Sequence, residues 1–356
     1  MPLLAVPARV APARIAIVTD AWAPQVNGVV RTLEAVIGEL RRRGHSVEAI
    51  SPAGIVSLPC PTYPEIRLAL MTPGAIGRRL AAFGAEAVHI ATEGPLGLAA
   101  RRWCLARGID FTTAYHTQFP DYVTERTGAN PEWIWRYVRW FHAPSSAVLV
   151  STPSVAATLE AHGIAHVHRW GRGVAPEFVA DGACDERLAA LKAQGRGPVM
   201  LHVGRVAPEK NIEAFLRLDV PGVKVVVGDG PARIALERRY PDVIFTGALF
   251  GAALAAAYRT ADVLVFPSRT DTFGLVMIEA AACGTPVAAY PVTGPVDVLT
   301  PRTGVMDDDL AAAIRGALTL DRGDCAAAAS VFTWAASADQ FLAALRPIRQ
   351  PLALVA

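Results

Sequence analysis

One stretch decides the fold: residues 263–286, VLVFPSRTDTFGLVMIEAAACGTP. Its first residues, Val263 to Phe266, are apolar and predict a buried parallel strand. Turn-forming residues follow as far as Gly274, and the apolar run from Leu275 to Cys283 predicts a helix that Gly284 ends. A strand, a loop and a buried helix in this order are typical of a parallel α/β sheet, which binds ligands at the carboxyl ends of its strands.

Two carboxylates flank the predicted loop. Asp271 lies within it, and Glu279 lies inside the otherwise apolar helix. A buried carboxylate without a partner is costly or takes up a proton, so Glu279 either has a partner elsewhere in the chain or faces water on an amphipathic helix. The sequence leaves both interpretations open, because charged side chains usually face water.

Strands alternate with helices along the whole chain, which indicates βαβ units and parallel sheets. In the first part we expect a helix over 29–43 and strands at 15–19, 46–51, 87–91, 111–115 and 147–151. In the second part we expect helices over 211–218, 232–240 and 252–260 and strands at 199–203, 223–227, 243–246, 263–266 and 286–290. The sequence therefore predicts an α/β protein with two doubly wound domains that face each other across a linker.

Composition excludes several classes of protein. The chain has 356 residues, 52% of them hydrophobic, and a net charge of +2, so nucleic acid is not an expected partner. Its five cysteines have no C-x-x-C spacing, which favours a reducing, cytoplasmic location and argues against disulfides and structural zinc. No apolar run approaches the ~18 residues of a membrane span. The first 14 residues lack the apolar core of a signal peptide, and we expect them to be a frayed start.

Two loops of the first part carry polar or glycine residues at the carboxyl ends of predicted strands. Gly28 opens the helix after the first strand, and a helix N-terminus attracts phosphate, although a plain turn is the simpler interpretation. His116 follows the strand that ends at Tyr115, where it could bind a sugar or serve only as a hydrogen-bonded structural residue.

The second part opens with a similar arrangement at its own first strand. Arg205 and Lys210 stand between that strand and the next helix, where two cations and free backbone N–H groups would bind a diphosphate. The alternative is that the two cations pair with Glu209 and Glu213.

Two further patterns suggest ligands that other residues argue against. Gly228 and Gly230 form G-x-G after a strand, but Arg233 stands where a dinucleotide fingerprint has its third glycine, so an NAD site is disfavoured. The run Asp307 to Asp309 precedes a predicted helix, and N-terminal capping explains it better than a metal site does.

The segment 131–142, PEWIWRYVRWFH, is rich in aromatic residues. Trp133, Tyr137 and Phe141 recur every four residues and predict one helical face, which we expect to point into the core. The alternatives are a wall of an acceptor site or contact with a membrane interface, where Trp and Arg are common.

Together these residues resemble the signature of the retaining family 4 glycosyltransferases. The resemblance lies in Asp271-x7-Glu279 with its Phe-Gly-Leu and Gly-Thr-Pro-Val segments, in Gly204-Arg205 with Glu209-Lys210-Asn211, and in residues 24–29, 115–117 and 228–231. It spans about Arg14 to Leu345 and is closest to the subgroup of bacterial α-mannosyltransferases and glucuronosyl- and sulfoquinovosyl-diacylglycerol synthases. That signature usually has Glu where Asp271 stands, and aspartate keeps the charge but is one methylene shorter.

The resemblance implies a GT-B fold of two Rossmann-like domains. The implied division is an acceptor-side domain at 14–175, a linker at 176–197, a nucleotide-sugar domain at 198–330 and a helix at 331–350 that crosses back to the first domain. It also implies that Arg205 and Lys210 bind the donor diphosphate, together with the backbone around Gly274, Leu275 and Val276.

The remaining site residues follow from the same resemblance. Glu279 would hold the nucleotide ribose, Gly28 would approach the phosphate from the opposite domain, and His116 and Asp271 would contact the sugar. His116, Asp271, Arg205 and Lys210 are thus the expected catalytic residues, and no metal or other cofactor is expected.

The expected function is metal-independent, retaining transfer of a hexosyl group from a nucleotide-diphosphate sugar to a lipid or lipid-linked glycan. GDP-mannose, UDP-glucose, UDP-glucuronate and UDP-sulfoquinovose all remain open as donors. The expected place is the cytoplasm, with peripheral contact at the inner face of the membrane as a further expectation. The alternatives are a nucleotide-binding pseudoenzyme and an NAD-dependent oxidoreductase.

Overall fold

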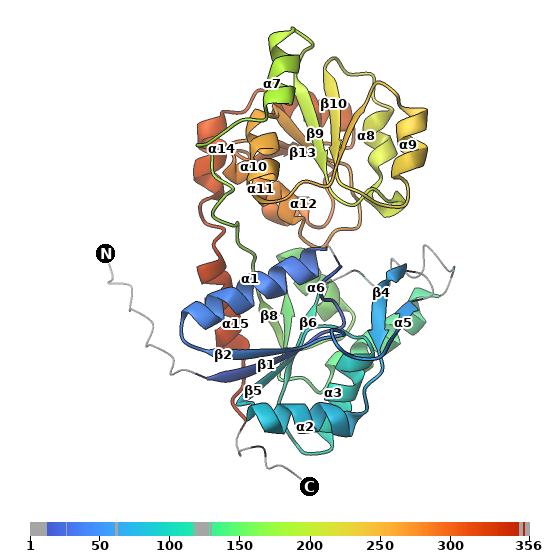
Figure 1. Ribbon diagram of the computed structural model, residues 1–356, viewed down its shortest axis with the longest axis vertical. Coiled ribbons are helices and arrows are strands. Elements are labelled where there is room, and N and C mark those ends of the chain that lie inside the picture. The colour runs from blue at the N-terminus through green and yellow to red at the C-terminus, as the bar shows by residue number, and fades with distance from the viewer. Residues whose placement is uncertain are drawn as a thin grey trace.

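The structure is a computed structural model that describes residues 13–25, 27–60, 63–116, 118, 128, 130–348 and 352. The expected frayed start therefore lies almost wholly outside the described residues. Two six-stranded parallel sheets stand one above the other (Figure 1), and we call the parts built around them the first half and the second half. The predicted α/β class and doubly wound sheets are confirmed.

The first half is built on a sheet of strand order β2-β1-β5-β6-β7-β8. Its strands are β1 (Arg14–Val18), β2 (Ser46–Ile50), β5 (Ala87–Ile90), β6 (Thr112–Tyr115), β7 (Ala147–Val150) and β8 (Val167–Arg169). Its helices are α1 (Gly28–Arg42), α2 (Pro73–Phe83), α3 (Pro95–Leu105), α5 (Pro131–His142) and α6 (Pro153–Ala161). An antiparallel hairpin, β3 (Ser57–Cys60) and β4 (Tyr63–Ala69), stands beside it.

Both faces of the first sheet are covered, which is why its strands read as continuous apolar runs. Along β1, Ala16 and Val18 pack against α2 and α3 on one face. Ile15 and Ile17 point to the other face and pack against α1 and the last helix of the chain, α15 (Trp334–Ala344).

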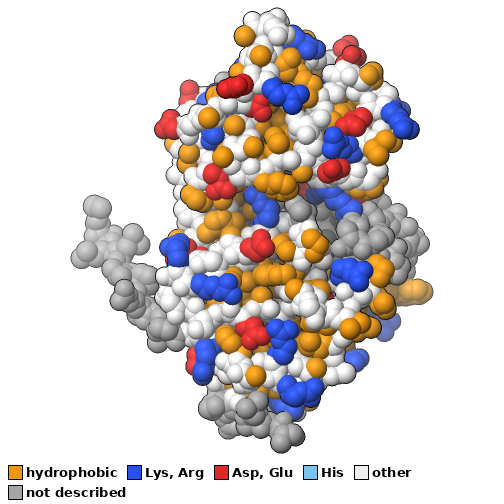
Figure 2. Space-filling view, viewed as in Figure 1, with side chains coloured by type: hydrophobic (Ala, Val, Ile, Leu, Met, Phe, Trp, Pro, Cys, Tyr) orange, Lys and Arg blue, Asp and Glu red, His pale blue; other side chains and the backbone are white. Residues whose placement is uncertain are grey.

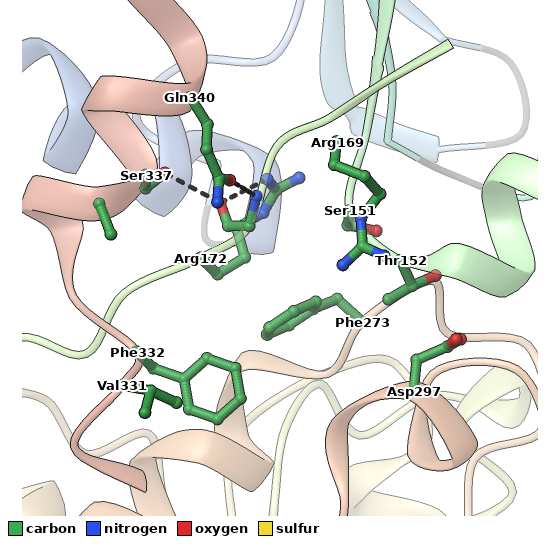
Figure 3. Close-up of a pocket in the computed structure, with 12 residues that line it drawn as sticks. Ser151, Thr152, Arg169, Arg172, Phe273, Asp297, Val331, Phe332, Ser337 and Gln340 are labelled. Carbon is green, nitrogen blue, oxygen red and sulfur yellow. Dashed lines mark hydrogen bonds between the residues drawn. The ribbon is translucent and has the colours of Figure 1, made fainter. Parts of the chain in front are cut away.

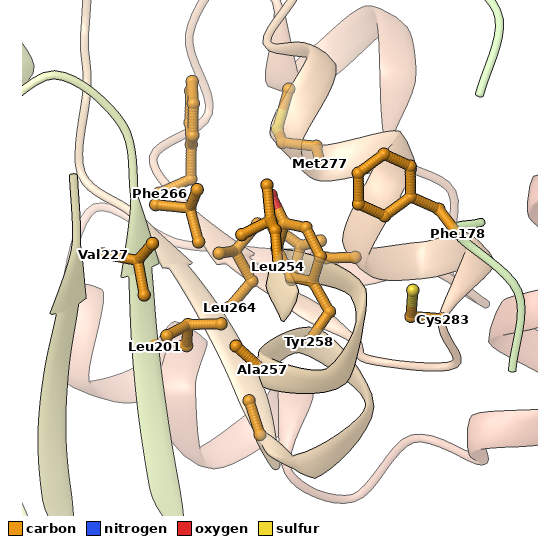
Figure 4. Packing of buried hydrophobic residues seen from close by; sticks show 14 of the residues in the cluster. Phe178, Leu201, Val227, Leu254, Ala257, Tyr258, Leu264, Phe266, Met277 and Cys283 are labelled. Carbon is orange, nitrogen blue, oxygen red and sulfur yellow. The ribbon is translucent and has the colours of Figure 1, made fainter. Parts of the chain in front are cut away.

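The second half repeats this plan with the strand order β11-β10-β9-β12-β13-β14. Its strands are β9 (Val199–Val203), β10 (Val223–Val227), β11 (Ile244–Gly247), β12 (Val263–Phe266), β13 (Val287–Ala289) and β14 (Gly304–Met306). Its helices are α7 (Glu186–Ala193), α8 (Ile212–Leu216) after a 3-10 turn (Pro208–Lys210), α9 (Arg233–Arg239), α10 (Gly251–Thr260), α11 (Leu275–Ala282), α12 (Pro295–Val298), α13 (Leu310–Ala317) and α14 (Arg322–Ala329). Figure 4 shows side chains of α10 and α11 packed with residues of the strands.

The end of α11 confirms the predicted helix stop. Gly284 has φ +74°, and Thr285 N–H donates to Ala280 O at 2.8 Å, as in a Schellman cap. The cap at Asp309 is also confirmed, because its carboxylate accepts from Ala311 N–H at 2.9 Å.

Two chain segments join the halves and lie side by side, since Val174 N–H donates to Phe332 O at 3.0 Å. The second segment leads into α15, which returns to the first half and packs beside α1 (Figure 1). Arg43 fixes it there by donating to Asp339 at 2.5 Å and to Ala335 O at 2.8 Å. The expected domain boundaries stay a prediction. The expected linker, 176–197, contains α7, and the buried Leu188 of α7 packs on the second sheet.

The aromatic helix α5 differs from the prediction. Its buried residues are Trp135, Val138, Phe141 and His142, whereas Trp133 is 69% exposed. The prediction that Trp133 points into the core was wrong. Trp135 fills the space between Tyr115 and His162 instead, and the centres of the Trp135 and His162 rings lie 3.7 Å apart.

Candidate functional site

The loop between β12 and α11 lies where the two halves meet. Gly274 has φ +81°, and a Cβ there would lie 2.7 Å from Met277 Cε and 3.0 Å from Phe266 Cζ, so the turn requires glycine. No side chain caps α11, and its first turn holds no acidic residue. Its first N–H groups, at Leu275 and Val276, therefore remain available for an anion.

Lys210 lies beside this loop, because β9 and β12 are neighbours in the sheet. Its Nζ is 2.5 Å from Asp271 Oδ1. Burial alone would raise the pKa of the Asp271 carboxyl, but the charge and hydrogen bond of Lys210, together with smaller contributions from Ser268 and His202, outweigh it and hold the pKa below its usual value. Asp271 Oδ2 is buried and has no hydrogen-bond partner among the described residues, so it can accept from a ligand hydroxyl.

Arg205 follows β9 directly. Its Nη1 lies 3.6 Å from Glu209 Oε1, so one pair of the sequence-based alternative is formed. The other pair is not formed among the described residues: Glu213 instead pairs with Arg217 and Arg239, and Lys210 pairs with Asp271.

Glu279 is buried, with 3% of its surface exposed, and its partners answer the question that the sequence left open. Arg31 of the first half lies 2.5 Å from Oε1, and the Tyr258 hydroxyl donates to Oε2 at 3.1 Å. Burial raises the pKa of Glu279, and the charge of Arg31 and the hydrogen bond from Tyr258 oppose that rise. Sequence reasoning missed Arg31, because nothing in its local pattern points to a partner 248 residues away.

Gly28 faces the second half across the same gap. A Cβ at this position would lie 3.8 Å from Leu275 Cδ1, so the N-terminus of α1 meets that of α11. Asn27 caps α1 by accepting from Val29 and Val30 N–H groups, both at 3.0 Å. The two helix N-termini thus make one electropositive junction. On the face shown in Figure 2, Lys or Arg side chains lie at this boundary, and elsewhere both charge signs are interspersed.

His116 lies at the carboxyl end of β6. Its Nδ1 is 3.3 Å from Arg172 Nη2, and because a guanidinium can only donate, Nδ1 accepts and Nε2 carries the proton of the neutral ring. Burial, with smaller contributions from Arg172 and His89, holds the pKa of His116 well below its usual range. Nε2 is buried without a hydrogen-bond partner among the described residues, so it is available to donate to a ligand.

Arg172 is a second residue that sequence reasoning missed. It is buried, and its guanidinium donates to Trp170 O at 2.6 Å and stands 4.7 Å from the centre of the Trp170 ring. Burial lowers its pKa to about 9, so it stays a cation at neutral pH. Its partners are backbone carbonyls and rings, which leave no charge pattern in the sequence.

Backbone contacts tie the loop to the first half. Thr272 Oγ1 donates to His116 O at 2.8 Å. The carbonyl of Thr272 accepts from Ser151 Oγ at 3.2 Å and from Thr152 Oγ1 at 3.3 Å. The site residues predicted on both halves therefore converge on residues 271–279.

A cavity of about 170 Å³ lies next to the segments that join the halves. Arg169 and Arg172 enter it from the first half, Phe273 and Asp297 from the second, and Phe332 from the returning segment (Figure 3). None of the residues predicted to bind the donor lines this cavity, so it is separate from the predicted donor site.

The two glycines at 228 and 230 serve packing. A Cβ at Gly228 would lie 1.8 Å from Gly204 O, and one at Gly230 would lie 2.4 Å from Val206 O. These glycines let the loops after β9 and β10 touch, so loop packing accounts for the G-x-G pattern. Within the described ranges, no group of three or more His, Cys, Asp or Glu residues could hold a metal ion, and no helix is long and apolar enough to cross a membrane.

Comparisons with known proteins match both halves. The family model described as Glycosyltransferase Family 4 matches residues 26–178, and the model described as Glycosyl transferases group 1 matches residues 197–320.

Relatives and solved structures agree with these models. A GDP-mannose-dependent alpha-mannosyltransferase of Mycolicibacterium smegmatis is 34% identical over 83% of this chain and 84% of its own. The alpha-monoglucosyldiacylglycerol synthase of Streptococcus pneumoniae is 26% identical over 78% of this chain and 71% of its own. The structure of sucrose-phosphate synthase from Thermosynechococcus elongatus superposes with a TM-score of 0.74 at 21% identity, covering 93% of this chain and 98% of that one.

Proposed function

Because the chain belongs to glycosyltransferase family 4, a retaining and metal-independent family of GT-B fold that uses nucleotide sugars, we propose that it transfers a mannosyl group from GDP-mannose to a lipid or lipid-linked glycan. The choice of mannose rests on the GDP-mannose-dependent relative, which is alike over most of both chains. The structural observation that supports a diphosphate donor is the uncapped N-terminus of α11 with Lys210 beside it and Gly28 opposite.

In the proposed complex, Arg205, Lys210 and the N–H groups of Leu275 and Val276 bind the donor diphosphate. These groups are fixed before the reaction starts, so they stabilise the charge that develops on the leaving phosphate more than they stabilise the ground state. Glu279 holds the ribose through Oε1, which has a second lone pair besides the one used by Arg31.

The sugar lies between Asp271 and His116. Asp271 Oδ2 accepts from a sugar hydroxyl, and His116 Nε2–H donates to another oxygen of the sugar. The bond between the sugar's anomeric carbon and the diphosphate oxygen breaks as the acceptor oxygen bonds to that carbon on the same face. The acceptor's proton passes to the leaving phosphate, and contact between the two halves keeps water out.

A lipid acceptor is supported by the outer face of α5. Trp133, Arg136 and Trp140 are exposed at positions i, i+3 and i+7, which places them on one side of the helix. Exposed Trp with Arg is typical of a protein face that rests in the membrane interface, which is where a lipid acceptor would be met.

The test is donor binding followed by turnover. We expect GDP to raise the melting temperature more than UDP does, because the proposed donor is a GDP-sugar. A ligand at ~100 times its dissociation constant stabilises the folded protein by ~2.7 kcal/mol, which gives a measurable shift. GDP-mannose with a bacterial lipid extract should then give a mannolipid and GDP in equal amounts. If UDP alone stabilises the protein, the proposed donor changes from GDP-mannose to a UDP-hexose. If neither nucleotide binds, the proposed donor site is wrong.

A further inference from the structure

Arg31 is placed by the first half but binds a carboxylate of the second. It lies in the first turn of α1, three residues after Gly28 and therefore on the same side of the helix. Its Nη2 reaches Glu279 Oε1 at 2.5 Å. The contact exists only while the two halves are close together, because each half supplies one partner.

Most of the guanidinium is unused. A guanidinium has five N–H donors in a fixed fork, and the contacts of the described residues give Arg31 one partner, Glu279. Its side chain is 39% exposed although Glu279 is buried, so part of the group faces the open side of the gap. The N-termini of α1 and α11 meet beside it, with Gly28 against Leu275.

We propose that Arg31 is a donor-binding residue of the first half, which bridges Glu279 and the donor's diphosphate. This rests on the proposed donor site. One edge of the Arg31 guanidinium stays on Glu279, and the other edge donates to a phosphate oxygen. Arg31 of the first half then binds the diphosphate together with two cations of the second half, Arg205 and Lys210. Donor binding then draws the halves together, because the diphosphate is held from both sides.

The fork geometry explains why arginine stands here. An ammonium is a single point of charge and cannot address a carboxylate and a phosphate along separate edges. Arg31→Lys should therefore keep Glu279 neutralised while losing most of the phosphate contact.

The experiment measures binding of GDP, UDP and guanosine by calorimetry to the wild-type protein and to three variants. Arg31→Ala and Arg31→Lys should weaken GDP and UDP binding about tenfold or more, the range of a lost charge-assisted hydrogen bond. Arg31→Lys, which keeps Glu279 neutralised, should leave guanosine binding nearly unchanged. Arg42→Ala is the matched control, since Arg42 lies at the other end of the same helix, is exposed and pairs with Glu39, which keeps Arg43 as a second partner. It should bind like the wild type.

A second background separates phosphate binding from mere neutralisation of Glu279. In Glu279→Gln, no buried charge needs Arg31, so a structural Arg31 would make the added Arg31→Ala change silent. The proposal expects a further loss of about tenfold in GDP affinity in this background. Equal GDP binding by Glu279→Gln and the double variant overturns it, as does equal binding by the wild type and Arg31→Ala. Wild-type protein that binds neither GDP nor UDP would instead overturn the proposed function.

Discussion

Lys210 Nζ lies 2.5 Å from Asp271 Oδ1, so an ion pair joins the loops that follow the adjacent strands β9 and β12. The pair holds a cation at the predicted diphosphate site and leaves the second carboxylate oxygen unbonded among the described residues. In the proposed function, this one contact positions both a ligand of the phosphate and a ligand of the sugar.

Removing Lys210 should affect both turnover and stability. Lys210→Ala should lower kcat/KM for the donor ~10²- to 10³-fold, because a fixed charge at the leaving group is lost. It should also destabilise the fold by ~1–2 kcal/mol, since the partly buried Asp271 loses the partner of its carboxylate. Steady-state kinetics and urea unfolding measure the two effects. The double variant with Asp271→Asn should recover stability but not activity; recovery of neither would contradict the pairing.

The buried histidines should make the protein less stable in mild acid. Burial lowers the pKa of His89 to about 3 and of His202 to about 4, and holds that of His116 well below its usual range. As pH falls below ~6.5, the unfolded chain takes up protons on these residues and the native state does not, so stability is lost at up to ~4 kcal/mol per pH unit from the three together. Chemical unfolding between pH 7 and 5 measures the slope. His116→Gln should flatten it by up to ~1.4 kcal/mol per unit, and an unchanged slope would show that His116 titrates in the native state.

Arg172 should act through His116. Arg172→Met removes the donor that keeps the proton on Nε2, so the ring can turn or change tautomer. We expect kcat to fall ~10- to 100-fold with little change in the donor KM. The spectroscopic check is the pattern of ring nitrogen shifts of His116 in ¹⁵N NMR. A Nε2–H tautomer retained in the variant would argue against this role.

Gly274 should not tolerate a side chain. Gly274→Ala places a Cβ 2.7 Å from Met277 Cε at φ +81°, and we expect a loss of ~2–3 kcal/mol with weaker nucleotide binding. Gly251→Ala is the control, because Gly251 also has positive φ, at +52°, but meets nothing within 4 Å. It should cost only ~1 kcal/mol, the strain alone. Equal costs at the two positions would mean that crowding at the turn is unimportant.

The exposed tryptophan of α5 should contribute to membrane binding. Trp133→Ser should reduce sedimentation with liposomes that contain anionic lipid, because an interfacial aromatic anchor is removed. Ile234→Ser removes a similarly exposed apolar side chain from the second half and should have no effect. Wild-type protein that sediments with neither neutral nor anionic liposomes would remove the membrane from the proposed function.

The elements that the sequence predicted well are those buried on both faces. Val199–Val203, Val223–Val227 and Val263–Phe266 were predicted to the residue, because each is a continuous apolar run between turn signals. The strands β8 and β14 were missed, since each has three residues at a sheet edge and carries little apolar signal. On α5, Trp135 is buried and Trp133 is exposed. Helical periodicity shows which residues share a face, but only the folded chain shows which face packs against other elements.

Part of the candidate site was predictable in each half. Residues such as Lys210 and Asp271 stand next to predicted strand ends, so sequence order places them at one edge. Arg31 and Arg172 were invisible, because their partners Glu279 and His116 come from distant segments and only the folded chain brings them together.

The return of α15 to the first half has a consequence for biosynthesis. Phe341 and Ala344 complete a core that begins with Ile15 and Leu33. During translation, the first half therefore exposes an apolar face until α15, which follows the second sheet along the chain, has left the ribosome. The usual order, in which an N-terminal domain finishes folding before the next one emerges, does not apply to this protein. A nascent chain arrested after the second sheet would still display that uncovered face, which makes it a substrate for chaperones and proteases.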